Sequence, residues 1–336
     1  PYVVVAHVED EQVTVWASTQ APFRVRQTAA ETLEISEENV HVVTPFVGGG
    51  FGGKKSGRQI SEAVRLSKIT GHPVQLAWTR REEFFYDAFR PAALVQLESG
   101  LNEDGKIMFW ECDILFTGSR SSEPIYNIPH FRVKTRSARN IHPFGTGAWR
   151  GPGSNTNVFA MESHTDILAR KAGMDPLSFR LNNLTDERMI RVLTTAAEKF
   201  DKSFYISPSG LGYGISCTNY LNSYVATIVQ VSVNKSTGTV KVEHVVCAQD
   251  MGEVINPQGA RLQIEGGITM GLSAALYEEI EFSGGKILTR NFDSYRITRF
   301  SDAPSIDAVL VDNPDIPPQG CGEPAITTVG AALANA

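Results

Sequence analysis

The chain has 336 residues, which is enough for two or three domains that each bury a core. Charged residues make up 20% of it and hydrophobic residues 42%, values that exclude a disordered or fibrous protein. A net charge of -6 without any basic block argues against nucleic-acid binding, and the absence of an apolar run of about 18 residues argues against a membrane span.

The first part of the chain is predicted to mix strands and helices. Apolar and polar residues alternate in the predicted strands, and Asp104-Gly105 forms a hairpin turn between the last two of them. The strand ranges are 2–7, 12–18, 40–47, 74–78, 92–99 and 106–116. One helix begins near Pro22, and a second covers 58–70 and ends before Gly71.

The second part begins with a long irregular stretch. Residues 130–153 are rich in Pro, Gly, Asn and Arg, which is typical of a loop, and residues 185–222 have weak periodicity and mark a candidate domain boundary. The elements predicted here are a helix over 156–172, strands over 224–233 and 239–248, and a helix from Pro257 to about Glu278. The fold class is therefore predicted to be α+β.

The cysteines and histidines of the chain do not form a metal-binding pattern. The cysteines lie far apart without a CxxC pair, and the histidines form neither HExxH nor HxH. The cysteine positions are Cys112, Cys217, Cys247 and Cys321. We expect no metal ligand from protein side chains, so any iron–sulfur cluster must lie on another chain.

A glycine-rich segment, Gly48 to Lys54, separates a predicted strand from a predicted helix and frees the backbone to approach a ligand. It matches the GxGxxG pattern of dinucleotide-binding folds, but the usual acidic residue is missing at the expected spacing. It also approaches the P-loop pattern of nucleotide hydrolases, but Lys55 stands where a serine or threonine would hold magnesium. A simple tight turn is the third interpretation, and the loop alone does not decide among them.

Four separated segments decide the question together. In chain order they are Ser18-Thr19-Gln20, GGGFGGK at 48–54, AWRGPG at 148–153 and GCGEP at 320–324. They resemble the molybdopterin-binding large subunit of the xanthine oxidase and aldehyde oxidoreductase family of molybdenum hydroxylases. The segments at 162–184 and 250–279 resemble helices of the same family, so the resemblance covers nearly the whole chain.

The resemblance implies how this chain would hold a molybdenum–molybdopterin cofactor, in its cytosine dinucleotide form. Gln20 would hydrogen-bond the oxo ligand of molybdenum through a neutral amide, and Phe51 and Gly52 would direct backbone N–H groups at the cofactor. Trp149 and Arg150 would contribute from the second loop. The implied cofactor-binding residues are Gln20, Gly50, Phe51, Gly52, Trp149, Arg150, Gly151 and Gly322.

The resemblance also implies a reaction. Glu323 would act as the general base in water-dependent hydroxylation of an aldehyde or an N-heteroaromatic carbon. The electrons would leave through partner chains, a [2Fe-2S] subunit and an FAD subunit, in the cytoplasm. Such a chain would be the catalytic subunit of a molybdopterin-dependent oxidoreductase.

Two positions depart from the family pattern where the substrate would bind. Lys55 replaces the glutamate that follows GGGFGGK in xanthine-oxidising members, which makes xanthine a poor candidate and predicts pairing with an anionic substrate such as an aromatic carboxylate. Trp149 replaces a phenylalanine and is expected to reshape the pocket. Arg120 is out of register with the family's second substrate-binding arginine.

A larger departure concerns the organisation of the chain. Residues 1–215 resemble the first cofactor-binding half, and residues 216–336 resemble a remnant of the second half, whose central segment is expected to be missing at 217–223. Either the sequence joins portions of a longer chain, or a partner chain supplies the missing half. The alternative is a non-catalytic scaffold that has lost the cofactor, with a P-loop-like nucleotide-binding protein as the remaining alternative.

Overall fold

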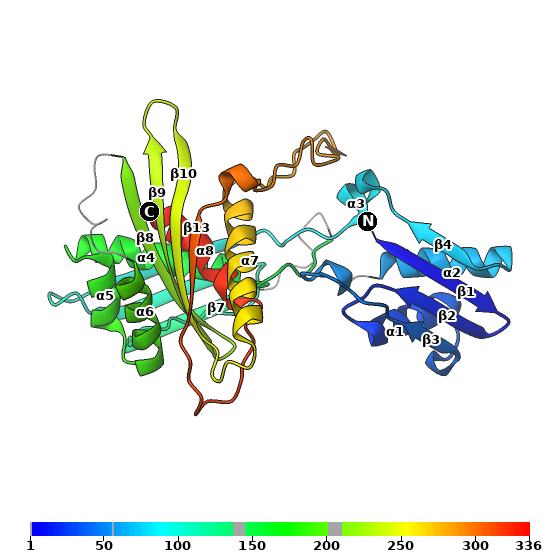
Figure 1. Ribbon diagram of the computed structural model, residues 1–336, viewed down its shortest axis with the longest axis horizontal. Coiled ribbons are helices and arrows are strands. Elements are labelled where there is room, and N and C mark those ends of the chain that lie inside the picture. The colour runs from blue at the N-terminus through cyan, green and yellow to red at the C-terminus, as the bar shows by residue number, and fades with distance from the viewer. Residues whose placement is uncertain (1, 56, 137–144, 201–209) are drawn as a thin grey trace. The chain divides into compact units, whose positions relative to one another are not determined.

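The computed structural model describes residues 2–55, 57–136, 145–200 and 210–336. The chain divides into two compact units (Figure 1). Unit 1 consists of 1–91, 142–150 and 280–295, and unit 2 consists of 92–141, 151–279 and 296–336. Within the described ranges, no helix is long and apolar enough to cross a membrane.

Unit 1 is built on a four-stranded sheet in the order β3-β2-β1-β4. Its strands are β1 (Val3–Glu9), β2 (Gln12–Ala17), β3 (Val40–Val43) and β4 (Val74–Ala77). β1 pairs with β2 and β4 in antiparallel fashion, and β3 runs parallel to β2. Every second residue of β1 is buried, which identifies the face that packs on the core.

Two helices form the other layer of unit 1. They are α1 (Pro22–Leu33) and α2 (Arg58–Thr70), and they contact both the sheet and each other. Their buried aliphatic residues join those of β1 and β2 in one core. A short helix, α3 (Arg80–Tyr86), and a small hairpin of β11 (Phe282–Ser283) and β12 (Lys286–Ile287) complete the unit.

Unit 2 contains a four-stranded sheet in the order β13-β10-β9-β8 and a three-stranded sheet in the order β5-β6-β7. The strands of the first sheet are β8 (Leu211–Tyr220), β9 (Ser223–Asn234), β10 (Thr239–Asp250) and β13 (Ser305–Leu310). Those of the second are β5 (Leu94–Leu101), β6 (Ile107–Leu115) and β7 (His130–Arg136). Its helices are α4 (Ser154–Lys171), α5 (Pro176–Asn183), α6 (Glu187–Lys199), α7 (Pro257–Leu276) and α8 (Pro324–Asn335).

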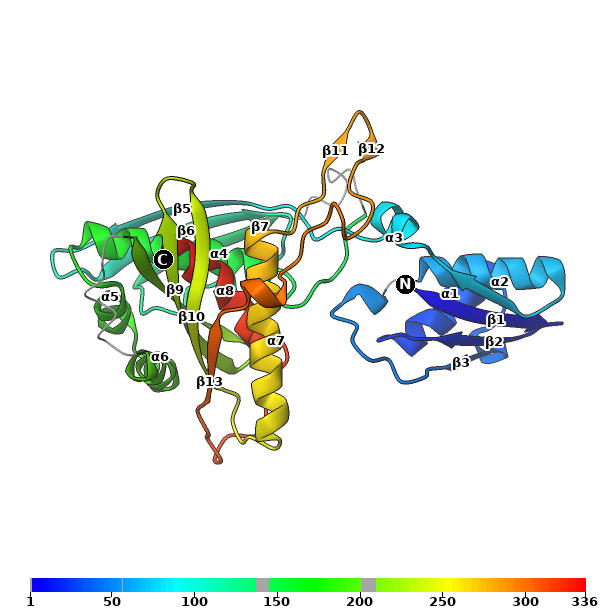
Figure 2. The same cartoon turned by 45° about the horizontal axis from the view of Figure 1, so that its top comes forward.

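The four-stranded sheet of unit 2 is covered on both faces, as Figures 1 and 2 show. Successive residues of a strand point to opposite faces, and in β9 Ala226 and Ile228 pack in the core that contains α6, whereas Val225 and Val229 pack in the core that contains α7 and α8. Burial on both sides explains why β8, β9 and β10 are almost continuously buried.

The α+β class and the hairpins, strands and helices that the sequence predicted are largely confirmed. The predicted loop over 130–153 is wrong at its start, because β7 is an edge strand whose exposed Arg132 and Arg136 pair with acids of β6 and conceal its alternation. The weak periodicity assigned to 185–222 overlooked α6 and β8, which both pack in the core of unit 2.

Candidate functional site

The residues predicted to form the site lie in both units. Unit 1 carries Gln20, the glycine-rich segment and Trp149-Arg150, whereas unit 2 carries Gly151 and the segment Gly322-Glu323. The border between the units therefore passes through the AWRGPG motif. Each group is described within its own unit.

In unit 1, the glycine-rich segment contacts Gln20, which lies three residues after the end of β2. The Gln20 N–H donates to the carbonyl oxygen of Lys54 at 3.0 Å, and the Gly52 N–H donates to Gln20 Oε1 at 3.1 Å. A Cβ atom at Gly50 would lie 2.5 Å from Gln20 Oε1, so the amide can rest there only on a bare backbone. The carbonyl end of the Gln20 amide is thus used within the loop, and its NH₂ end is the donor left to face a ligand.

The backbone around Phe51 has an unusual conformation. Phe51 has a φ of 49°, in the left-handed region that non-glycine residues rarely adopt. Gly52 follows with a φ of +100°, and a Cβ atom there would lie 2.4 Å from the carbonyl oxygen of Ala148. The loop is therefore pressed against the segment that carries Trp149 and Arg150. Backbone strain of this kind concentrates at functional sites, and the role of this loop stays a prediction.

The side chains beside this loop combine an exposed ring with a buried charge. The Phe51 side chain is 50% exposed, whereas Arg150 is buried and holds its guanidinium carbon 5.7 Å from the centre of the Phe51 ring. Trp149 is half-buried, with the guanidinium carbon of Arg90 at 5.6 Å from its ring. Both contacts are cation–π in kind; the first joins the glycine-rich segment to Arg150, and the second joins Trp149 to the segment that follows α3.

The two adjacent lysines have different environments. Lys54 Nζ donates to Ser18 Oγ at 2.8 Å and to the carbonyl oxygen of Val47, so it ties the two ends of the loop together. A P-loop lysine must instead reach the phosphates of a nucleotide, and these contacts speak against that alternative. The side chain of Lys55 is exposed.

In unit 2, Glu323 directly precedes α8 and accepts hydrogen bonds on both carboxylate oxygens. The N–H of Gly151 donates to Oε1 at 3.0 Å, and the Tyr220 hydroxyl donates to Oε2 at 2.7 Å. Gly151 has a φ of +72°, and a Cβ atom there would lie 2.7 Å from Asn155 Oδ1. Glycine at this position lets the backbone approach the carboxylate. A Cβ atom at Gly322 would lie at ordinary van der Waals distance from its neighbours.

Sequence reasoning missed Tyr220. This residue ends β8 and is 3% exposed, and Arg120 Nη1 donates to its hydroxyl oxygen at 3.2 Å. Burial, followed by the hydrogen bond to Glu323, raises the pKa of Tyr220 to about 12. Arg120, which the sequence placed only out of register with a substrate-binding arginine, thus contacts the tyrosine.

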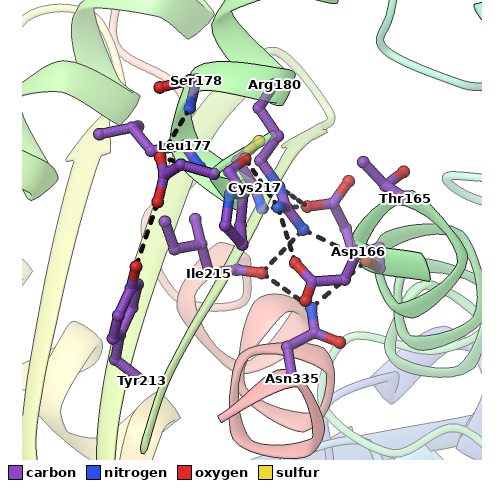
Figure 3. A network of polar contacts seen from close by, with 12 residues as sticks. Thr165, Asp166, Leu177, Ser178, Arg180, Tyr213, Ile215, Cys217 and Asn335 are labelled. Carbon is purple, nitrogen blue, oxygen red and sulfur yellow. Dashed lines mark hydrogen bonds and ion pairs between the residues drawn. The ribbon is translucent and has the colours of Figure 1, made fainter. Parts of the chain in front are cut away.

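A buried ionic network fastens β8 to the helices beside it (Figure 3). Arg180 is fully buried and donates to Glu162 Oε2 at 3.1 Å, to Asp166 Oδ1 at 3.0 Å and to the carbonyl oxygen of Ile215 at 2.9 Å. The N–H of Cys217 donates to the same Glu162 oxygen at 2.9 Å. The strand that ends in Tyr220 is therefore anchored at two residues to α4 and α5.

Unit 2 also contains a largely polar cavity of about 480 Å³. Its volume lies within the usual range for small-molecule sites. The lining comes from the loop before β7, the end of β8 and the starts of α6 and β9, with Asp186, Asn219 and Tyr224 among its polar residues. None of the site residues predicted from the sequence lines this cavity.

Comparison with known proteins gives consistent similarities. Two family models, each described as a molybdopterin cofactor-binding domain, match residues 1–184 and 183–304. A nicotinate dehydrogenase component from Pseudomonas putida is 29% identical over 97% of the chain, and the beta component of isoquinoline 1-oxidoreductase from Brevundimonas diminuta is 30% identical over 97%. The chain spans only 31% and 45% of these two relatives.

Solved structures with a similar fold give a second comparison. The crystal structure of quinoline 2-oxidoreductase from Pseudomonas putida 86 superposes with a TM-score of 0.90 over 100% of this chain and 70% of that chain. Since the sequences are only 16% identical, this match establishes the fold and leaves the chemistry to the site residues.

Proposed function

Because the chain belongs to the molybdopterin cofactor-binding domain family, we propose that it forms the cofactor-binding, catalytic part of a molybdenum hydroxylase. The proposed reaction is water-dependent hydroxylation of an aldehyde or an N-heteroaromatic carbon. The observation that carries the proposal is the carboxylate of Glu323, which accepts hydrogen bonds on both oxygens, one of them from Gly151, 172 residues away. The AWRGPG and GCGEP motifs are thus in contact through the carboxylate of Glu323.

The donors that unit 1 presents fit a molybdopterin cofactor. The NH₂ group of Gln20 carries no net charge, and within the described part of unit 1 the N–H of Phe51 has no hydrogen-bond acceptor. Fixed neutral donors of this kind suit an oxo group or other anionic oxygens. Glycine at 50 and 52 keeps the approach free of side chains. Gln20, Phe51 and Arg150 would hold the cofactor from unit 1.

The role of Glu323 follows from its hydrogen bonds. When bound, the molybdenum cofactor supplies the oxidising centre that accepts the electrons of the reaction. A carboxylate has about four lone-pair sites, and Gly151 and Tyr220 use one on each oxygen, which leaves acceptor sites for a proton of the attacking water. General-base catalysis contributes roughly 10² to 10⁴ in rate, and Glu323→Gln removes it.

The remaining components are also part of the proposal. The cofactor would be the cytosine dinucleotide form, and the electrons would pass to [2Fe-2S] and FAD partner chains in the cytoplasm. Both relatives are named as single components of larger enzymes, which supports an assembly of several chains. The dispersed cysteines of this chain support placing the iron–sulfur clusters elsewhere. A partner chain or a further portion of the protein would complete the cofactor contacts, with residues 1–215 and 216–336 as the two cofactor-binding halves.

Lys55 is proposed to select an anionic substrate. Its side chain is exposed, and a lysine is a point charge that pairs with carboxylates. The similarity to a component of a nicotinate dehydrogenase supports an aromatic acid of that class, and Trp149 would shape the pocket. In Lys55→Met we expect the Michaelis constant for nicotinate-like acids to rise while that for a neutral N-heteroaromatic stays the same. An unchanged constant for the acids would rule out this role.

The decisive experiment measures molybdenum and turnover in the same preparations. The protein would be purified with its bound partner chains from a host that makes the cofactor, and wild type would be compared with Glu323→Gln. We expect molybdenum near one atom per chain in both, with turnover only in wild type. A wild-type protein without molybdenum would refute the proposal and favour the non-catalytic scaffold.

A further inference from the structure

We infer that Tyr220, held by Arg120, is a positioning residue that fixes the carboxylate of Glu323 as a hydrogen-bond acceptor. This inference rests on the proposed function, in which Glu323 is the base. The chain of contacts runs from Arg120 Nη1 to the Tyr220 hydroxyl at 3.2 Å, and from that hydroxyl to Glu323 Oε2 at 2.7 Å.

The direction of each hydrogen bond is forced by the chemistry of its partners. An arginine guanidinium has only donors, so the Tyr220 oxygen must accept from Arg120. The single hydrogen of the phenol is then directed at Glu323, whose ionised carboxylate has only acceptors. Arg120 therefore sets the orientation of the tyrosine hydroxyl, and the tyrosine in turn fixes the position of the Glu323 carboxylate.

The backbone holds Tyr220 rigidly in this place. Leu221 and Asn222 form a two-residue hairpin turn with φ values of 51° and 66°, so Tyr220 and Ser223 pair directly across the turn. Ser223 is fully buried, and its hydroxyl donates to the carbonyl oxygen of Gly320 at 2.7 Å. The hairpin thus contacts the GCGEP loop at two residues, Gly320 and Glu323.

Tyr220 remains a hydrogen-bond donor at every ordinary working pH, because the pKa of its buried phenol is raised to about 12. The charged groups in contact with its hydroxyl are Arg120 and Glu323. Loss of the phenol should therefore release the Glu323 carboxylate from its fixed position.

The test uses Tyr220→Phe in the loaded complex, with Tyr213→Phe as the matched control. Tyr213 lies on the same strand and also donates to a carboxylate, Asp175 Oδ1 at 3.1 Å, but does not contact Glu323. For Tyr220→Phe we expect an unchanged molybdenum content, a fall in kcat of roughly tenfold to a hundredfold, the size expected for one hydrogen bond to a charged group, and a smaller change in KM. Tyr213→Phe should leave both kcat and KM unchanged.

A second readout does not depend on turnover. A water-soluble carbodiimide with an amine nucleophile couples to accessible carboxyl groups, and peptide mass spectrometry reports how fast Glu323 becomes labelled. At one fixed pH, labelling of Glu323 should be faster in Tyr220→Phe, where the carboxylate has lost a hydrogen-bond partner, but not in Tyr213→Phe. Arg120→Met, a change at an exposed side chain, should produce a smaller loss of kcat, roughly twofold to tenfold, because the phenol is kept but no longer oriented.

The outcomes separate the two proposals. Wild-type kcat and labelling rate in a fully loaded Tyr220→Phe protein would overturn this inference and leave the proposed function intact. If Tyr220→Phe loses its molybdenum through misfolding, Arg120→Met decides, and an unchanged kcat there would overturn the inference. Wild-type protein without molybdenum or turnover would overturn both.

Discussion

Arg180 offers the sharpest test of how unit 2 is held together. Arg180→Met would leave Glu162, 2% exposed, and Asp166, 5% exposed, as buried carboxylates without their cation. Breaking a buried ion pair from one side costs about 3 to 5 kcal/mol, because the remaining charge stays desolvated. Arg180→Lys keeps the charge but loses the planar fork that reaches both acids and Ile215, so its cost should be intermediate.

A thiol-labelling assay reports this cost locally. The N–H of Cys217 contacts Glu162, and its buried thiol, whose pKa is raised by burial, reacts only when the network opens. At about 1.4 kcal/mol per decade, Arg180→Met should speed labelling of Cys217 by roughly 100-fold to 3000-fold. The partly exposed Cys321 serves as the internal reference for intrinsic reactivity.

A surface variant supplies the control for this prediction. Arg26 and Glu37 form an exposed ion pair at 3.0 Å in unit 1, and Arg26→Met should cost about 0 to 1 kcal/mol and leave the labelling of Cys217 unchanged. Labelling of Cys217 in Arg180→Met within about threefold of wild type, less than 1 kcal/mol, would refute the argument that the network anchors β8.

Three further predictions concern the loop and the tyrosine. Gly52→Ala should abolish molybdenum loading, because its Cβ would overlap a backbone carbonyl, whereas Gly48→Ala has open space and should cost only about 1 kcal/mol of unfolding free energy; metal analysis and chemical denaturation measure these effects. Lys54→Met should lower molybdenum content by loosening the loop, and Lys55→Met should not; equal contents would contradict this. Because the pKa of Tyr220 is raised in the folded state, its contribution to the unfolding free energy is complete below pH 10 and is lost as pH rises towards about 12. The unfolding free energy, measured by chemical denaturation, should therefore fall less steeply with pH in Tyr220→Phe.

Much of the fold and of the residue set could be predicted from the sequence because those signals are local. Pro22 and Asn256 mark helix starts, Gly71 adopts the left-handed conformation that ends α2, and GCGEP and GGGFGGK are contiguous motifs. The family resemblance drawn from those motifs is confirmed. The strand β7 was missed because a charged edge strand lacks an apolar face.

The contacts around Glu323 could not be predicted because their partners are remote in sequence. Tyr220 lies 103 residues from Glu323 and 100 from Arg120, and nothing in the local sequence distinguishes it from a core tyrosine. Glu162 and Arg180 lie 18 residues apart on different helices, outside the spacing that marks a pair along one helix. Tertiary contacts of β8 with α4 and with α8 bring these groups together.

The consecutive residues Arg150 and Gly151 make their contacts in different units. Arg150 lies over the Phe51 ring in unit 1, whereas the N–H of Gly151 donates to Glu323 in unit 2. The peptide bond between Arg150 and Gly151 thus links two contacts. Arg150 contacts the loop proposed to hold the cofactor, and Gly151 donates to the carboxylate proposed to act as base. Because Gly52→Ala perturbs the first unit and Tyr220→Phe the second, cofactor loading and proton transfer should fail separately. Loss of molybdenum in a Tyr220→Phe protein that remains folded would mean that the two units do not contribute independently.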